Sequence, residues 1–303
     1  MNWFLIALIG PALWSVTNHL DKYLIGRYIK GGGIGALTVF SALIGLLVAP
    51  LIYVFNPQVI GVEPKTAFLI ALNGTLYLVA IIPYFYALNK DEASKVVPLF
   101  QLIPVITYAL AYFILGETLN NTQIVGAIFI IVGAVAISLE LAETKNIRLK
   151  TEVFWLMLLA SFIISINFTL FKYFALDVNF WTASFWEYVG FIFFGVFILA
   201  FVKSYRTEFV SLIQENKVPV LGLNGFNEVI NIIGKLAFNF ATLLAPITLI
   251  WVVNGLQPFF VFLYGILLTI FFPKISQENI TKKHLAHKLI AIFLIFVGTT
   301  LIN

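Results

Sequence analysis

Ten long apolar segments, separated by short polar connections, leave this chain few ways to fold. Hydrophobic residues make up 61% of its 303 residues and charged residues only 11%, which is more apolar surface than a water-soluble core can hide. In lipid, each segment must satisfy its own backbone polar groups, and this favours helices. The sequence therefore predicts an all-α membrane protein with ten transmembrane helices, at residues 3–22, 34–55, 66–89, 94–115, 121–139, 152–175, 179–202, 218–243, 246–272 and 285–302.

The positive charges between these segments are sorted by side. The 18 lysines and arginines lie in the connections that follow odd-numbered segments, with the exceptions of Lys65, Lys172 and Lys235. Basic residues mark the cytoplasmic face of a membrane protein, so we predict that both termini are non-cytoplasmic. The net charge of +4 is then explained by topology and by anionic lipid headgroups. It predicts contact with the lipid bilayer and no nucleic acid partner.

The two halves of the chain are similar to each other. Leu72-Asn73-Gly74 matches Leu223-Asn224-Gly225, and Pro104 in the fourth segment matches Pro258 in the ninth. Each half has an odd number of segments, so the second half must be inverted relative to the first. Inverted repeats place a substrate site near the membrane midplane and permit alternating access. We therefore predict a first five-helix repeat at 1–142, a cytoplasmic connector at 143–152 and a second, inverted repeat at 153–303.

Several short motifs accompany this five-plus-five arrangement. Leu115-Gly116-Glu117-Thr118-Leu119 precedes a glycine-bearing segment with Gly126 and Gly133, and the first segment ends with Trp14, Asn18 and Lys22. Over essentially the whole chain, these features resemble the EamA type of the drug/metabolite transporter superfamily. Members of that family move small polar metabolites, amino acids, sugars or nucleotide-linked sugars. The resemblance implies transport across the plasma membrane without naming a cargo.

The eighth segment carries a polar stripe. The stripe consists of Asn224, Glu228, Asn231, Lys235 and Asn239, with Asn227 beside them. Successive members are four, three, four and four residues apart, which places them on one helical face. A charged side chain near the bilayer centre costs at least about 2.5–3.5 kcal/mol, so it usually faces a cavity or a partner. The stripe either lines a central cavity, which we favour, or forms a buried hydrogen-bonded seam against another helix.

Three charged residues within the segments can serve substrate binding or coupling. Glu187 in the seventh segment lies at nearly the same depth as Lys235, so the two can form a structural ion pair. Glu228 lies closer to the midplane, where a carboxyl group can bind a substrate ammonium or take up and release a coupling proton. Lys235 can instead meet a substrate carboxylate or phosphate. The sequence leaves these alternatives open.

Other polar and aromatic residues within the segments are weaker candidates for the same site. Tyr77 and Tyr84 occupy the repeat positions of Glu228 and Lys235. The remaining candidates are Trp14, Asn18, Gln101, Asn254 and Gln257. Each of these alone is more often a contact between helices than a ligand contact. Gly126 and Gly133 form a smooth face that suits close packing, either inside the fold or in a homodimer.

The leading functional hypothesis is a secondary transporter. It would move a small polar solute, a metabolite, by alternating access about a midplane cavity, with proton coupling as an open alternative. A flippase for a lipid-linked sugar is the second hypothesis, with Lys22, Lys90 and Lys95 at headgroup level. An integral-membrane enzyme is disfavoured because we find no nucleophile motif, phosphate loop or histidine cluster, and the chain has no cysteine. We therefore predict no catalytic residues, no metal site and no cofactor.

Overall fold

The regular structure of the chain is helical. A computed structural model describes residues 3–28, 34–90, 96–140, 151–215, 217–271 and 282–302. Its α-helices and short 3-10 helices (η) are α1 Trp3–Tyr28, α2 Ile34–Leu43, α3 Gly45–Phe55, η1 Pro57–Ile60, α4 Pro64–Lys90, η2 Val97–Gln101, α6 Leu102–Leu115, α7 Asn121–Glu140, α8 Thr151–Val178, α9 Phe180–Phe201, α10 Lys203–Glu215, α11 Lys217–Thr242, α12 Ile247–Val253, η3 Asn254–Leu256, α13 Gln257–Phe271 and α14 Lys282–Ile302.

The described helices include six that are long and apolar enough to cross a membrane. The prediction of an all-α membrane protein is therefore confirmed. Shorter apolar stretches occur at Leu99–Leu115, Asn121–Ala136 and Leu289–Ile302, and α11 coincides with the predicted eighth segment. The total of ten spans stays a prediction, as does the repeat division; the predicted connector at 143–152 lies almost entirely outside the described residues.

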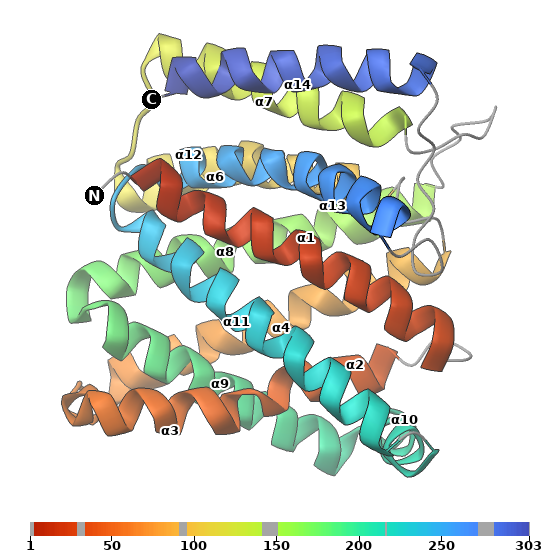
Figure 1. Ribbon diagram of the computed structural model, residues 1–303. Helices are drawn as coiled ribbons and strands as arrows, with labels where there is room; N and C mark the ends of the chain where they lie inside the picture. The colour runs from red at the N-terminus through yellow and green to blue at the C-terminus, as the bar shows by residue number, and fades with distance from the viewer. Residues whose placement is uncertain are drawn as a thin grey trace.

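The helices lie in stacked layers, with α1 and α11 inclined to the helices of the two outer edges (Figure 1). At one edge α7 and α14 lie side by side, and next to them lie α6, α12 and α13. The middle of the molecule is formed by α1, α4, α8 and α11, and the far edge by α2, α3, α9 and α10. Both ends of the described chain lie at the same end of the bundle, opposite to α10 (Figure 1).

Two of the predicted spans contain 3-10 turns close to a proline. Residues Val97–Gln101 are in a 3-10 helix just before Pro104, and residues Asn254–Leu256 are in another just before Pro258. Proline has no N–H to donate to the carbonyl four residues earlier, so the regular helical ladder cannot continue unchanged across it. The two prolines that match in the sequence therefore each accompany a local break in the helix.

Between α9 and α11 lies α10, an amphipathic helix that was not predicted from the sequence. Its Phe209 and Leu212 pack against Ala36 and other apolar residues at the start of α2. The Glu208 carboxylate accepts a hydrogen bond of 2.9 Å from the Gly35 backbone N–H, which satisfies one of the free N–H groups at the start of α2. A polar segment of this kind escapes a search for apolar spans.

Glycines allow the backbones of α4 and α9 to come unusually close. A Cβ atom added at Gly190 would lie 1.9 Å from the Ala71 carbonyl oxygen, and one added at Gly74 would lie 2.1 Å from that of Glu187. Both would collide with backbone, which cannot rotate away as a side chain can. The crossing therefore requires glycine on both helices, and it fixes where Glu187 lies relative to α4.

We expect Gly190→Ala to destabilise the protein by up to about 3 kcal/mol, the upper range for overpacking of an interior. Thermal unfolding of the purified protein in detergent measures this. Gly222→Ala is the matched control, since a Cβ there meets nothing within 4 Å. Equal melting temperatures for the two variants would show that α4 and α9 do not meet at this crossing.

The smooth face of α7 is covered within the chain. A Cβ atom added at Gly126 would lie 2.8 Å from the Gly298 carbonyl oxygen, and one at Gly133 would lie 2.7 Å from the Ile295 side chain. Of the two uses that the sequence left open for these glycines, the structure shows packing inside the fold, against α14. A homodimer stays a prediction, and it would have to use a different surface.

Candidate functional site

A polar cavity of about 160 Å³ lies inside the bundle. Its walls come from the middle and C-terminal parts of α1 and α4, from α2, from the junction of η2 and α6, from the N-terminal half of α11, from the middle of α8 and from the break between α12 and α13. Because α10 directly precedes α11 in the chain, the cavity extends toward the end of the bundle where α10 lies. Its volume is large enough for several water molecules or a small solute.

Most of the residues predicted for the site line this cavity. They are Trp14, Asn18, Tyr77, Tyr84, Asn224, Asn227, Glu228, Asn231, Asn254 and Gln257. Three predicted residues do not line it: Glu187, Lys235 and Gln101. Lys235 contributes to a much smaller space of about 10 Å³ that Glu228 and Tyr77 also line. Gln101 is buried at the end of η2 beside Gly255.

Two carboxylates face the cavity, one from α1 and one from α11. Asp21 accepts a hydrogen bond of 2.6 Å from the Asn227 amide, and Glu228 accepts one of 2.7 Å from the Ser41 hydroxyl. A weaker contact of 3.4 Å joins the Asn231 amide to Glu228. All of these partners are neutral, so the described residues give neither carboxylate a cation to neutralise it.

Several buried polar atoms around the cavity have no hydrogen-bond partner among the described residues. They are the Asn224 Nδ2, the Asn227 Oδ1, the Asn254 Oδ1, the Trp14 Nε1 and the Trp251 Nε1. Buried polar groups in folded proteins are nearly always satisfied by protein, water or a ligand. Unsatisfied donors and acceptors gathered around one cavity therefore indicate that it holds polar molecules.

An aromatic cluster closes the inner end of the cavity. The ring centroids of Trp14 and Phe238 are 5.1 Å apart, those of Phe168 and Trp251 are 4.9 Å apart, and those of Phe238 and Trp251 are 5.0 Å apart. Trp14, Phe168 and Trp251 also line the cavity. Phe238 is fully buried, so the cluster continues from the cavity wall into the packed interior.

Glu187 and Lys235 form a buried ion pair beside this aromatic cluster. The Lys235 Nζ lies 3.0 Å from the Glu187 Oε1, and the two side chains are 2% and 0% exposed. The ammonium also lies 4.5 Å from the centre of the Tyr77 ring and 4.6 Å from that of Phe168, within the range of cation–π attraction. Lys235 is thus already paired and enclosed.

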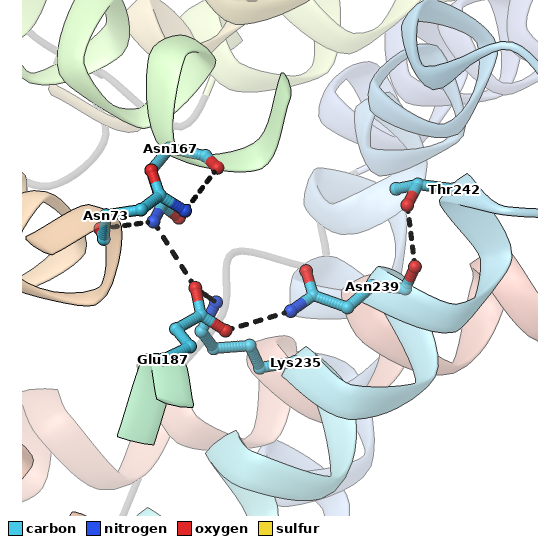
Figure 2. A network of polar contacts seen from close by, with 6 residues as sticks. All are labelled: Asn73, Asn167, Glu187, Lys235, Asn239 and Thr242. Carbon is cyan, nitrogen blue, oxygen red and sulfur yellow. Dashed lines mark hydrogen bonds and ion pairs between the residues drawn. The ribbon is translucent and has the colours of Figure 1, made fainter. Parts of the chain in front are cut away.

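Amide side chains extend the ion pair into a network across four helices (Figure 2). Asn239 donates a hydrogen bond of 3.2 Å to the Glu187 Oε2, and Asn167 donates one of 3.3 Å to the Oε1. Asn167 and Asn73 also bind each other's backbone carbonyls, at 2.9 and 3.1 Å. Every oxygen of the Glu187 carboxylate is therefore paired, as a buried charge requires.

The polar stripe on α11 is a cavity wall along one part and a buried seam along another, which are the two alternatives that the sequence left open. Its first part, with Asn224, Glu228 and Asn231, lines the cavity. Its last part, with Lys235 and Asn239, forms a buried seam with Glu187 of α9. The change occurs where α11 passes from the cavity to the packed part of the bundle.

The Gly116-Glu117 motif has a structural role at the opposite end of the bundle. Gly116 adopts a φ of 67° as the C-cap of α6, a conformation that favours glycine. Glu117 then accepts a hydrogen bond of 2.8 Å from the Ile247 N–H at the start of α12, and it pairs with Lys172 near the end of α8. Lys172 also donates to the Ala245 carbonyl at 2.8 Å. The motif thus joins three segments.

We expect Glu117→Gln to destabilise the protein by about 1.5–3 kcal/mol, the range for a hydrogen bond to a charged group. Glutamine can still accept from the Ile247 N–H, but it leaves the Lys172 charge without its partner. Glu152→Gln is the control, because its pair with Lys90 is 65% and 39% exposed and should contribute less than about 1 kcal/mol. Thermal unfolding compares the two, and similar losses would contradict the structural role of Glu117.

Asp21 and Ser41 line the cavity but were not among the residues predicted from the sequence. Asp21 lies seven residues after Trp14 and three after Asn18, so helical spacing places it on the same face as these two predicted residues. Ser41 carried no signal, because a single serine in an apolar segment is common. Within the described residues, no group of three His, Cys, Asp or Glu side chains is placed to hold a metal ion.

A bundle of apolar helices around a polar cavity is an arrangement typical of membrane transporters. The chain belongs to the EamA-like transporter family, whose sequence pattern matches residues 1–139. The resemblance seen in the sequence is thus confirmed, and the chain is a member of a transporter family, not an enzyme. An uncharacterised protein of Methanocaldococcus jannaschii is 31% identical over 97 residues, which cover 32% of this chain and 71% of that protein.

For two further relatives, the match covers a smaller share of the relative's own length. The probable amino-acid metabolite efflux pump of Salmonella typhimurium is 29% identical over 145 residues, or 44% of this chain and 47% of that protein. An uncharacterised transporter of Clostridium kluyveri is 27% identical over 131 residues, or 43% of this chain and 41% of that protein. The matches thus span about half or less of these two transporters.

A solved crystal structure shares the fold over nearly the full length. The superposition covers 99% of this chain and 95% of the other, with a TM-score of 0.68 and 17% sequence identity. At this identity the likeness shows the fold alone. It does show that the arrangement of the whole chain, and not only of residues 1–139, has a counterpart among known proteins.

Proposed function

We propose that the protein is a secondary transporter that moves a small polar metabolite by alternating access about the cavity between α1, α4, α8 and α11. The observation that carries this proposal is the group of buried, unsatisfied polar atoms around that cavity, from Asn224, Asn227 and Asn254. A small-molecule site is a concave space with a few convergent polar groups, and this cavity meets that description. The name of the Salmonella relative adds support for a metabolite as cargo.

Two observations support an arrangement of ten spans in two inverted repeats. The family pattern matches 1–139, close to the first repeat that we place at 1–142. The 3-10 breaks before Pro104 and Pro258 occur at matching places in the two halves, and broken helices often accompany transporter sites. The cavity takes its walls from both halves, as expected of a site at a repeat interface.

The sorting of charges supports an orientation with both termini outside the cytoplasm, in the plasma membrane. In this orientation α10 lies at the cytoplasmic end, and the cavity extends toward the cytoplasm. The flippase alternative has less support. Of its three lysines, Lys90 pairs with Glu152, and the side chains of Lys22 and Lys95 lie outside the described part of the structure.

A screen of metabolites by thermal unfolding tests the proposal. Amino acids, amines, sugars and nucleotides are added to the purified protein, and a true ligand at 100 times its Kd should stabilise it by about 2.7 kcal/mol. Each hit is then tested for counterflow in proteoliposomes. Ile81→Trp fills the cavity without removing a polar group, so it should abolish both effects.

Leu72→Trp is the matched control, because Leu72 is an exposed residue of the same helix. It should leave binding and counterflow unchanged. A hit that binds and exchanges equally well in Ile81→Trp would place the transport site elsewhere. If wild-type protein neither binds nor exchanges any metabolite class, the proposed function is wrong.

A further inference from the structure

The charge of the cavity walls restricts what the cavity can hold. Its lining contains two carboxylates, Asp21 and Glu228, and no lysine, arginine or histidine among the described residues. Both carboxylates have only neutral hydrogen-bond partners, Asn227 for Asp21 and Ser41 with Asn231 for Glu228. A carboxylate taken out of water without a cation is unfavourable. The described walls therefore supply no positive charge, and neutralisation of the two carboxylates is left to a bound cation or a proton.

Lys235 cannot supply this charge. Its ammonium is 3.0 Å from the Glu187 carboxylate and 2% exposed, and it is enclosed by the rings of Tyr77 and Phe168. The pair is neutral as a whole, so it does not compensate the two cavity carboxylates. For the same reason Lys235 is not available to a substrate carboxylate or phosphate, which was one of the alternatives drawn from the sequence.

The neutral part of the lining is strongly aromatic. Trp14, Tyr77, Tyr84, Phe85, Phe100 and Trp251 all face the cavity. Aromatic faces attract cations, and they also provide apolar contact for a hydrocarbon body. A site with both aromatic and acidic side chains can therefore bind an ammonium group together with the apolar body that carries it. An anion in the same space would meet two carboxylates and no basic group.

We infer that the substrate is an organic cation, an amine or quaternary ammonium compound with an apolar body, whose charge is bound between Asp21 and Glu228. This inference rests on the proposed function, since it names the substrate class of the same cavity. The ammonium supplies the positive charge that the described walls do not, and the body of the amine lies against the aromatic walls. The amides of Asn224 and Asn254 remain free to bind polar substituents of the substrate.

Matched probes that differ only in charge test the inference. We would measure binding to the full chain in detergent by titration calorimetry, with 2-phenylethylamine, 3-phenylpropionate and phenylalanine, and with a series of primary and quaternary amines whose bodies range from methyl to naphthyl. At least one amine should bind at least tenfold more tightly than the carboxylate of matching size. Phenylalanine should bind more weakly than 2-phenylethylamine, because its carboxylate would face Asp21 and Glu228.

The two carboxylates are tested one at a time. Asp21→Asn and Glu228→Gln should each weaken amine binding at least tenfold, and both substitutions keep an oxygen that can accept the existing hydrogen bond. Glu63→Gln, at an exposed carboxylate, is the control and should change nothing. Melting temperatures without ligand show whether each variant is folded. Unchanged amine affinity in both folded cavity variants would overturn the inference.

Failure of this inference differs from failure of the proposed function. If the carboxylate or the zwitterion binds as well as the amine, and Ile81→Trp removes that binding, the cation inference is wrong while the transport cavity stands. If no amine in the series binds, the cation inference is wrong as well, and the metabolite screen decides the proposed function separately. If Ile81→Trp leaves every interaction and all exchange unchanged, the cavity is not the transport site.

Discussion

Lys235→Met is expected to destabilise the protein by about 3–5 kcal/mol, the range for breaking a buried pair by removing one partner. The substitution leaves the Glu187 carboxylate fully buried with only the amides of Asn167 and Asn239 to satisfy it. Thermal unfolding in detergent measures the loss. Lys65→Met, at an exposed lysine, is the matched control and should have little effect.

A double variant separates the effect of the two charges on stability from the effect of packing. The double variant Glu187→Gln with Lys235→Met removes both charges and keeps two side chains of similar size. We expect it to regain most of the stability, because replacing a whole buried pair by uncharged groups is often neutral or stabilising. If the double variant loses the sum of the two single losses, the two charges do not interact, and the network in Figure 2 does not hold α9 and α11 together.

Glu228→Gln is expected to reduce transport by about ten- to a hundredfold, which corresponds to a lost interaction of about 1.5–3 kcal/mol with a charged ligand group. The fold should be unaffected, because the glutamine oxygen can still accept from the Ser41 hydroxyl. Uptake of a metabolite identified by the screen, measured in proteoliposomes, tests this. Glu228→Asp keeps the charge and should retain part of the activity.

The comparison with Glu228→Asp distinguishes a charge requirement from a packing requirement. If aspartate and glutamine at this position reduce uptake equally, the length of the side chain is what matters. Wild-type uptake by a folded Glu228→Gln protein would remove Glu228 from the site. Uptake measured with and without an imposed proton gradient would also show whether the same carboxylate serves proton coupling.

The helices of this protein are largely predictable from sequence because the membrane imposes them. The predicted spans 121–139 and 179–202 correspond to α7 Asn121–Glu140 and α9 Phe180–Phe201, since each apolar run must be helical in lipid. α10 was not predicted, because it is stabilised by one apolar face against Ala36 and Val220 and not by a continuous apolar run. The helices of the apolar segments thus follow from composition, whereas α10 depends on tertiary contacts.

The candidate site was predictable only in part. The spacing along α11 identified the polar face with Glu228 and Lys235, because a helix fixes which residues share a face. It could not divide that face into a cavity wall and an ion pair, since the division depends on which helix lies opposite each residue. Helical spacing within α1 places Asp21 on the same face as Trp14 and Asn18, but only the packing of α1 beside α11 brings that face to the site.

The pairing of α7 with α14 at one edge of the bundle (Figure 1) has a consequence for the surrounding lipid. The two helices approach each other closely at Gly126 and Gly298, and Val125, Ile128 and Phe293 are exposed on their outer sides. Neighbouring acyl chains should therefore contact the two helices as one continuous apolar surface.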